Sequence, residues 1–77
     1  MNLTKRLPEF LKEKRKQAQL TQPDLAEKAG VGLRFIRELE QGKTSLRMDK
    51  VNQVLKLFGH ELSPVPINRQ TLINEES

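Results

Sequence analysis

The chain has 77 residues, of which 35% are apolar and three, all phenylalanine, are aromatic. A chain of this length forms one small domain with a narrow margin of stability, which a second copy or a large ligand would widen. It has no cysteine, which excludes disulfides and cysteine-ligated zinc, and its one histidine cannot build a metal site alone. We therefore expect no metal and no other cofactor. The absence of a long apolar run predicts a cytoplasmic protein without a membrane partner.

The charge is distributed unevenly along the chain. Fourteen Lys and Arg residues against ten Asp and Glu residues give a net charge of +4. Residues 1–60 carry 13 basic and 7 acidic side chains, a net charge of +6, whereas residues 61–77 carry a net charge of −2. A basic body is typical of proteins that bind a polyanion, most often nucleic acid, but it also suits a merely solvated surface. Charge alone leaves both alternatives open.

Apolar residues recur at spacings of three and four and never alternate strictly, which predicts a helical protein. The first helix is expected to begin near Pro8, since proline is tolerated in the first turn, and Glu9 there faces the positive end of the helix dipole. Its apolar stripe is expected to consist of Leu7, Phe10, Leu11 and Ala18. Arg15 shares this stripe and should therefore point toward the body of the domain.

Two short helices joined by a tight turn are expected next. Thr21 should cap the second helix, with Asp24 completing a capping box, and Gly30 should end it in the left-handed conformation. The third helix is expected to end at Gly42, and its apolar repeat is Val31, Phe35, Ile36 and Leu39. A helix, a glycine turn and a helix at this spacing predict a helix-turn-helix, whose second helix fits the major groove of B-DNA.

A linker through Thr44 and Ser45 leads to a fourth helix, expected at about residues 49–58. Pro64 and Pro66 exclude a helix from residues 61–67, which should be extended, either as a dimerisation strand or as an ordinary tail. Residues 68–77 are polar and are expected to be disordered. The sequence therefore predicts an all-α domain over residues 1–60, a bundle of four short helices, followed by an extended or short β segment.

The strings LTQPDLAEKAGV and IRELEQGK closely resemble the helix-turn-helix of the phage-repressor and Cro type, also called XRE-like. The resemblance covers residues 7–62, and the residues in register with it are Gln22, Leu25, Ala26, Gly30, Val31, Ile36, Glu40 and Gly42. Continuing through LRFIRELEQGKTSLRMDKVNQVLKLFGHEL, the chain is similar to the HipB-type antitoxins. This resemblance implies a lambda-repressor-like fold, a dimeric repressor of its own operon and a HipA-type kinase toxin as partner.

Arg15 and Glu40 are expected to form an ion pair. Glu40 lies one turn after Ile36 and should therefore point inward, as Arg15 does. A charge buried alone costs several kcal/mol, so each of the two requires the other. The resemblance implies the same pair, and the alternative is two independently solvated charges.

The outward face of the third helix supplies the candidate base-reading residues Leu33, Arg34, Arg37 and Glu38. Arg34 is the first candidate, because an arginine that donates two hydrogen bonds to guanine makes the commonest specific contact. Leu33 could contact a thymine methyl, and Arg37 either a base or a phosphate. Glu38 could accept from cytosine or orient an arginine. Phe35 is interpreted as a core residue, because it shares a stripe with Leu39.

Candidate phosphate contacts lie at two places in the motif. Gln22 can present its amide and the N-terminus of the second helix to a phosphate. After the third helix, the resemblance implies a second contact at Gly42 and Lys43, which Thr44, Arg47 and Lys50 could extend.

A single helix-turn-helix contacts one half-site, so useful affinity usually requires a two-fold dimer. The resemblance to HipB-type antitoxins implies that the segment after the fourth helix pairs with its copy, which makes the candidate dimerisation residues Leu57, Phe58, Leu62, Val65 and Ile67. His60 is interpreted as a helix-end or strand residue, and we expect no catalytic residues and no enzyme.

The sequence therefore predicts a dimeric, sequence-specific repressor that binds double-stranded DNA, and the resemblance to HipB-type antitoxins implies that it is the antitoxin of a HipA-type kinase. Two alternatives stay open. One is an interaction module that acts mainly by neutralising a toxin, and the other is a repressor with no toxin at all.

Overall fold

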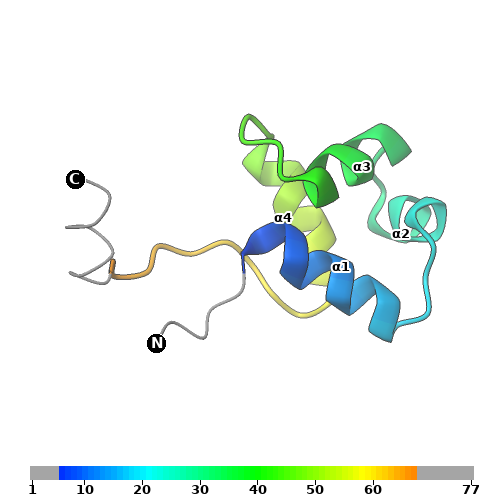
Figure 1. Cartoon of the computed structure of the whole chain (residues 1–77), viewed down its shortest axis with the longest axis horizontal. Coiled ribbons are helices and arrows are strands. Elements are labelled where there is room, and N and C mark those ends of the chain that lie inside the picture. The colour runs from blue at the N-terminus through cyan, green and yellow to red at the C-terminus, as the bar shows by residue number, and fades with distance from the viewer. Residues whose placement is uncertain (1–5, 68–77) are drawn as a thin grey trace.

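The computed structural model describes residues 6–67. This part of the chain contains four α-helices, which are α1 Leu7–Gln17, α2 Gln22–Ala29, α3 Leu33–Gln41 and α4 Met48–Leu57 (Figure 1). The prediction of a four-helix, all-α domain is confirmed. No strand occurs among the described residues, so the short β segment considered for residues 61–67 is not found there. The expected disorder of residues 68–77 concerns residues outside those described.

The helix α1 begins where the sequence predicts but ends earlier. Pro8 lies in its first turn, Leu11 is fully buried, and α1 ends at Gln17. Gln19 then adopts a positive φ of 59°, which turns the chain toward α2. Ala18 therefore lies beyond the helix and is exposed, so the prediction that it belongs to the buried stripe is wrong.

The helix α2 has the predicted cap at each end. Thr21 Oγ1 accepts a hydrogen bond from the Asp24 backbone N–H at 3.1 Å, and the Asp24 carboxylate accepts one from the Thr21 N–H at 3.0 Å. This second bond is the main reason that the pKa of Asp24 is lowered. At the other end Gly30 has a φ of 73°, a conformation that side chains with a β-carbon resist. The turn between α2 and α3 therefore follows from local sequence.

All four helices contribute to one core. Its buried apolar residues are Leu11, Leu25, Ala26, Ile36, Leu39, Val51, Val54 and Leu55. The helix α3 packs against α1 and α2, and α4 packs against α2. Phe35 is half-buried against this core, in agreement with its periodicity, and Leu46 joins it from the linker before α4. The outward side of α3 is left free of other helices (Figure 1).

The chain after α4 is tied back to the domain at three points. The His60 backbone N–H donates to the Leu55 carbonyl at 2.9 Å, and the His60 ring meets the Phe10 ring edge-on, with 4.8 Å between centroids. The Leu62 N–H donates to Asn52 Oδ1 at 2.7 Å. These contacts place His60 at a helix end, one of the two positions expected. None of the helices in residues 6–67 has the length and apolarity to span a membrane.

Candidate nucleic-acid interface

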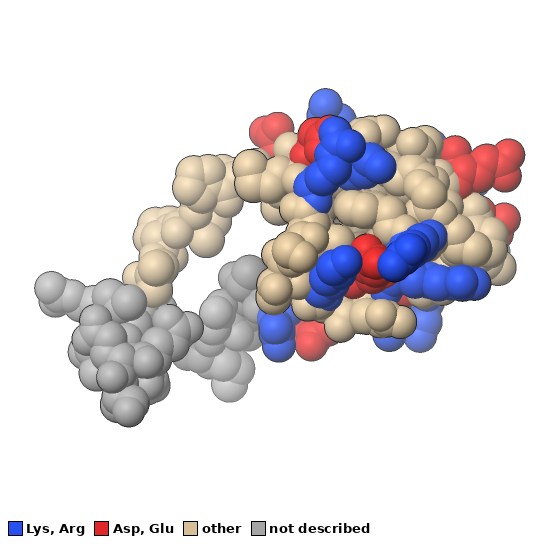
Figure 2. All heavy atoms as spheres, turned by 90° about the horizontal axis from the view of Figure 1, so that it is seen from above, with Lys and Arg blue, Asp and Glu red and all other residues tan. Residues whose placement is uncertain are grey.

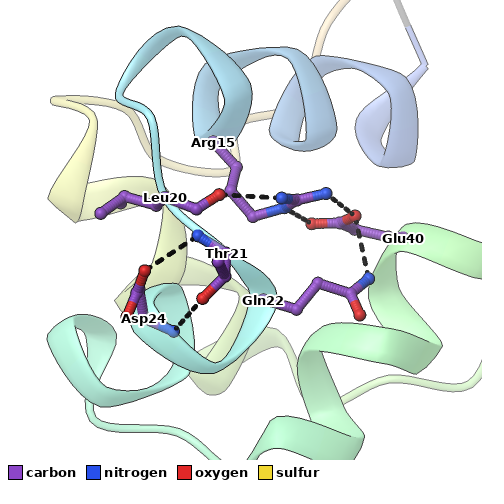
Figure 3. Close-up of polar contacts among 6 residues, drawn as sticks. All are labelled: Arg15, Leu20, Thr21, Gln22, Asp24 and Glu40. Atoms are coloured by element: carbon purple, nitrogen blue, oxygen red, sulfur yellow. Dashed lines mark hydrogen bonds and ion pairs between the residues drawn. The ribbon is translucent and has the colours of Figure 1, made fainter.

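A polar network inside the domain attaches α3 to α1 and α2 (Figure 3). Arg15 Nε lies 2.7 Å from Glu40 Oε2, and Arg15 Nη2 lies 3.0 Å from Glu40 Oε1. Arg15 Nη1 also donates to the Leu20 carbonyl at 2.9 Å. Glu40 is only 8% exposed, so the structure brings the two residues together as a shielded ion pair.

The electrostatics of this network keep both groups charged. Burial alone would raise the pKa of the Glu40 carboxyl, but the hydrogen bonds from Arg15 and Gln22 outweigh burial, and the pKa is lowered. The hydrogen bond to Glu40 in turn raises the pKa of Arg15. The orientation of α3 therefore depends on a carboxylate that stays ionised at neutral pH.

Gln22, a candidate phosphate contact, belongs to the same network. Its Nε2 donates to Glu40 Oε1 at 3.2 Å, and the residue is half-buried at the first position of α2. This contact is not predictable from the sequence, because the two residues are 18 positions apart and no spacing rule links them. The Gln22 side-chain amide, which could contact a phosphate, is thus oriented by its hydrogen bond to Glu40 of the ion pair.

The opposite side of α3 carries the candidate base-reading residues. The Arg34 side chain is 92% exposed, and Arg37 is also exposed, with no hydrogen bond or ion pair to another residue of the described chain. Leu33 is half-buried against the core, which leaves less of its side chain for a base. The two arginines are therefore the most accessible donors on this face of α3.

Glu38 lies between two cations. Its Oε1 is 3.2 Å from Arg34 Nε and 3.3 Å from Lys43 Nζ. The hydrogen bond from Lys43 is the main cause of the lowered pKa of Glu38, and Arg34 adds to it. The pair with Lys43 follows from the end of α3, where Gly42 has a φ of 86° and the Lys43 N–H donates to the Glu38 carbonyl at 3.1 Å. This pair is not among the predictions from sequence, although the helix end at Gly42 was a signal for it.

The remaining candidate phosphate contacts follow α3. Gly42 is half-buried, whereas Thr44 and Arg47 are exposed. Arg47 donates two hydrogen bonds to Asp49, from Nε at 3.1 Å and from Nη2 at 2.7 Å, so its guanidinium is already paired. Lys50 is half-buried in the first turn of α4. Figure 2 shows that basic side chains, with acidic ones between them, gather on the face that contains α3 and the linker to α4.

The candidate dimerisation residues lie at the end of α4 and beyond it. Leu57, Leu62, Val65 and Ile67 are large apolar side chains with exposed fractions of 41%, 37%, 75% and 66%. Phe58 is half-buried against the core instead. Within residues 6–67, no group of three or more His, Cys, Asp or Glu side chains is placed to hold a metal ion.

Comparison with known proteins agrees with this geometry. The family model HTH_3, described as "Helix-turn-helix", matches residues 11–63, which include α2, α3 and α4 entirely. The "Uncharacterized HTH-type transcriptional regulator y4mF" of Sinorhizobium fredii is 53% identical over 45 residues. The aligned region is 58% of this chain and 59% of that protein, so the match spans less than two thirds of the relative.

Proposed function

The chain belongs to the HTH_3 family of helix-turn-helix proteins, and from this premise we propose that it regulates transcription by sequence-specific binding to double-stranded DNA. Membership of this family makes it a DNA-binding regulator rather than an enzyme, and the relative in Sinorhizobium fredii carries the name of a transcriptional regulator. The observation that carries the proposal is the two-sided character of α3, which has a buried Glu40 on one side and an exposed Arg34 on the other.

The shape of α3 suits the major groove. A helix with its side chains is about 10–12 Å across, and the groove of B-DNA is about 12 Å wide. The residues that contact base edges in a helix-turn-helix lie toward the N-terminus of the second helix, and Arg34 is the second residue of α3. Lys43 follows the C-terminal end of α3, where its side chain is 47% exposed beside Glu38, and we expect it to contact a phosphate at the edge of the groove.

The proposal is tested by titrating DNA with the protein in a gel-shift or anisotropy assay over a series of salt concentrations. The DNA from upstream of its own gene is compared with an unrelated duplex of the same length. We expect tighter binding to the upstream DNA and a linear fall of log affinity with log salt for both duplexes. Equal affinity for the two duplexes, or affinity insensitive to salt, would contradict the proposal.

A second proposal is that the protein acts as a homodimeric repressor. The exposed apolar side chains of Leu57, Leu62, Val65 and Ile67 support it, because burial against a second copy would remove them from water. Pro64 and Pro66 lack an N–H donor, so any pairing of backbones there must be short. Sedimentation equilibrium tests this proposal: the wild type should be dimeric and the Val65→Asp/Ile67→Asp variant monomeric. A monomeric wild type would overturn it.

A third proposal rests on the resemblance of residues 33–62 to HipB-type antitoxins: the protein represses its own operon and binds a HipA-type kinase toxin. The supporting test is whether a neighbouring reading frame encodes a kinase-like protein and whether the two chains purify as a stoichiometric complex. Without such a neighbour, a repressor with no toxin is the better description. If the kinase is bound but the upstream DNA is not, the chain is chiefly an interaction module.

A further inference from the structure

Glu38 is an acidic residue enclosed by basic ones on the face proposed to meet DNA. Its side chain is 25% exposed, whereas those of Arg34 and Lys43 are 92% and 47% exposed. Figure 2 shows acidic atoms lying directly between basic groups on this face. A carboxylate in such a position repels phosphates and lowers the affinity for any DNA. Attraction to DNA therefore does not explain why Glu38 lies on this face.

Glu38 engages Arg34 through a single nitrogen. The two residues are four positions apart on α3, so their side chains meet across one helical turn. Arg34 Nε donates to Glu38 Oε1 at 3.2 Å, while the two terminal nitrogens of Arg34 make no hydrogen bond to the described part of the chain. Two donors of the Arg34 guanidinium, as a bidentate contact to guanine requires, are thus left available.

Glu38 engages Lys43 through both backbone and side chain. The positive φ of Gly42 turns the chain back, and the Lys43 N–H donates to the Glu38 carbonyl at 3.1 Å. In the same turn Lys43 Nζ lies 3.3 Å from Glu38 Oε1. Lys43 can therefore give its full charge to a phosphate only by weakening its contact with Glu38.

We propose that Glu38 is a specificity-determining residue, which competes with DNA phosphates for Lys43 and positions the guanidinium of Arg34 for a base. This inference rests on the proposed function. On any DNA sequence, Glu38 weakens binding because Lys43 must leave it. On the cognate sequence, the positioned Arg34 recovers that loss through its contacts with the base. Glu38 thus lowers absolute affinity while it raises the ratio between cognate and other DNA.

The experiment compares Glu38→Gln with the wild type on two duplexes of equal length. One is enriched from a random pool by the wild-type protein, and the other has an unselected sequence. We expect Glu38→Gln to bind the unselected duplex about two- to fivefold more tightly than the wild type does, the range for loss of an exposed ion pair. Its increase in affinity for the enriched duplex should be smaller. The salt dependence on unselected DNA should steepen by up to about one unit of slope.

Three further variants make the test specific. Glu61→Gln removes the same charge from an exposed residue after α4 and should leave the ratio between the duplexes unchanged. When Lys43 is already replaced by Gln, Glu38→Gln should raise the affinity for unselected DNA by no more than Glu61→Gln does, because Glu38 then has no lysine to withhold from a phosphate. Glu38→Asp keeps the charge but shortens the side chain, so it should also lower the ratio; it serves if Glu38→Gln proves unfolded by circular dichroism.

Two results would overturn the inference while leaving the proposed function intact. One is a ratio that stays at the wild-type value in both Glu38→Gln and Glu38→Asp. The other is a loss of preference confined to a C·G pair that Arg34→Ala leaves unaffected, which would make Glu38 a direct base reader. Failure of the proposed function is recognised separately, because a wild-type protein that enriches no sequence from the pool would already refute it.

Discussion

Arg15 of α1 and Glu40 of α3 form a two-bond ion pair, with 2.7 Å between Nε and Oε2 and 3.0 Å between Nη2 and Oε1. The side chains are 12% and 2% exposed, respectively. Because Arg15 also donates to the Leu20 carbonyl, the same guanidinium touches the chain just before α2. The pair thus orients α3 relative to the rest of the helix-turn-helix, in addition to the apolar contacts beneath it.

Loss of this pair should be costly for folding. Arg15→Ala leaves the buried Glu40 carboxylate without its main partner, and we expect the free energy of unfolding to fall by about 3 kcal/mol. Lys16→Ala, on the exposed side of the same helix, should change it by less than about 0.5 kcal/mol. Urea denaturation followed by circular dichroism measures both. Equal unfolding free energies for the two variants would show that the pair is not structural.

Acid should destabilise the protein partly through Glu40. The pKa of this carboxyl lies below its ordinary value of 4.5 in the folded state. Its contribution to stability is therefore fully present above about pH 4.5 and is lost as the pH falls through the lower, folded-state pKa. In urea titrations at a series of pH values, Glu40→Gln should be less stable than the wild type at neutral pH. The unfolding free energy of Glu40→Gln should also fall less steeply than that of the wild type as the pH is lowered. Equal slopes for the two proteins would show that Glu40 does not contribute to the acid sensitivity.

The capping box of α2 supports a third prediction. Thr21→Ala removes the Oγ1 that accepts from the Asp24 N–H, and we expect a loss of about 1 kcal/mol in unfolding free energy. Thr21→Ser keeps the hydroxyl and should retain most of the stability. Thermal melting of the two variants makes the comparison. If Ala and Ser variants melted at the same temperature, the hydroxyl would contribute nothing to the cap.

The features predicted correctly from sequence depend on close neighbours. The Thr21 cap, the Gly30 helix end and the four helices follow from residues within one helical turn. The prediction for Ala18 was wrong because an apolar spacing does not reveal where a helix ends, and Gln19 adopts its left-handed conformation without being glycine.

The contacts that the sequence could not predict join distant or alternative partners. The hydrogen bond from Gln22 to Glu40 depends on how α2 and α3 pack, which spacing along the chain does not determine. For Glu38, the sequence offered a cytosine or an arginine as partner. The structure pairs it with an arginine, Arg34, and also with Lys43, which the sequence did not suggest as a partner, because Gly42 brings Lys43 back to the helix.

The last prediction concerns the different roles proposed for Arg34, as a base reader, and Lys43, as a phosphate contact. Arg34 lies near the start of α3 with free terminal nitrogens, and Lys43 follows its end. Arg34→Ala should weaken binding to the enriched duplex roughly tenfold and reduce discrimination at one base pair. Lys43→Ala should weaken binding to all sequences by a similar factor and reduce the slope of log affinity against log salt by about one.

Competition binding to a panel of duplexes with single base-pair changes separates the two roles. Removing a base-reading arginine lowers the affinity only for duplexes that contain the base it contacts. The affinities of Arg34→Ala should therefore not depend on the base pair at one position, and at all other positions they should vary as those of the wild type do. A phosphate contact lowers every affinity by the same factor, so the profile of Lys43→Ala should keep its shape. If Arg34→Ala also kept its shape, Arg37, exposed on the same helix without a partner in the described chain, would become the base reader to test.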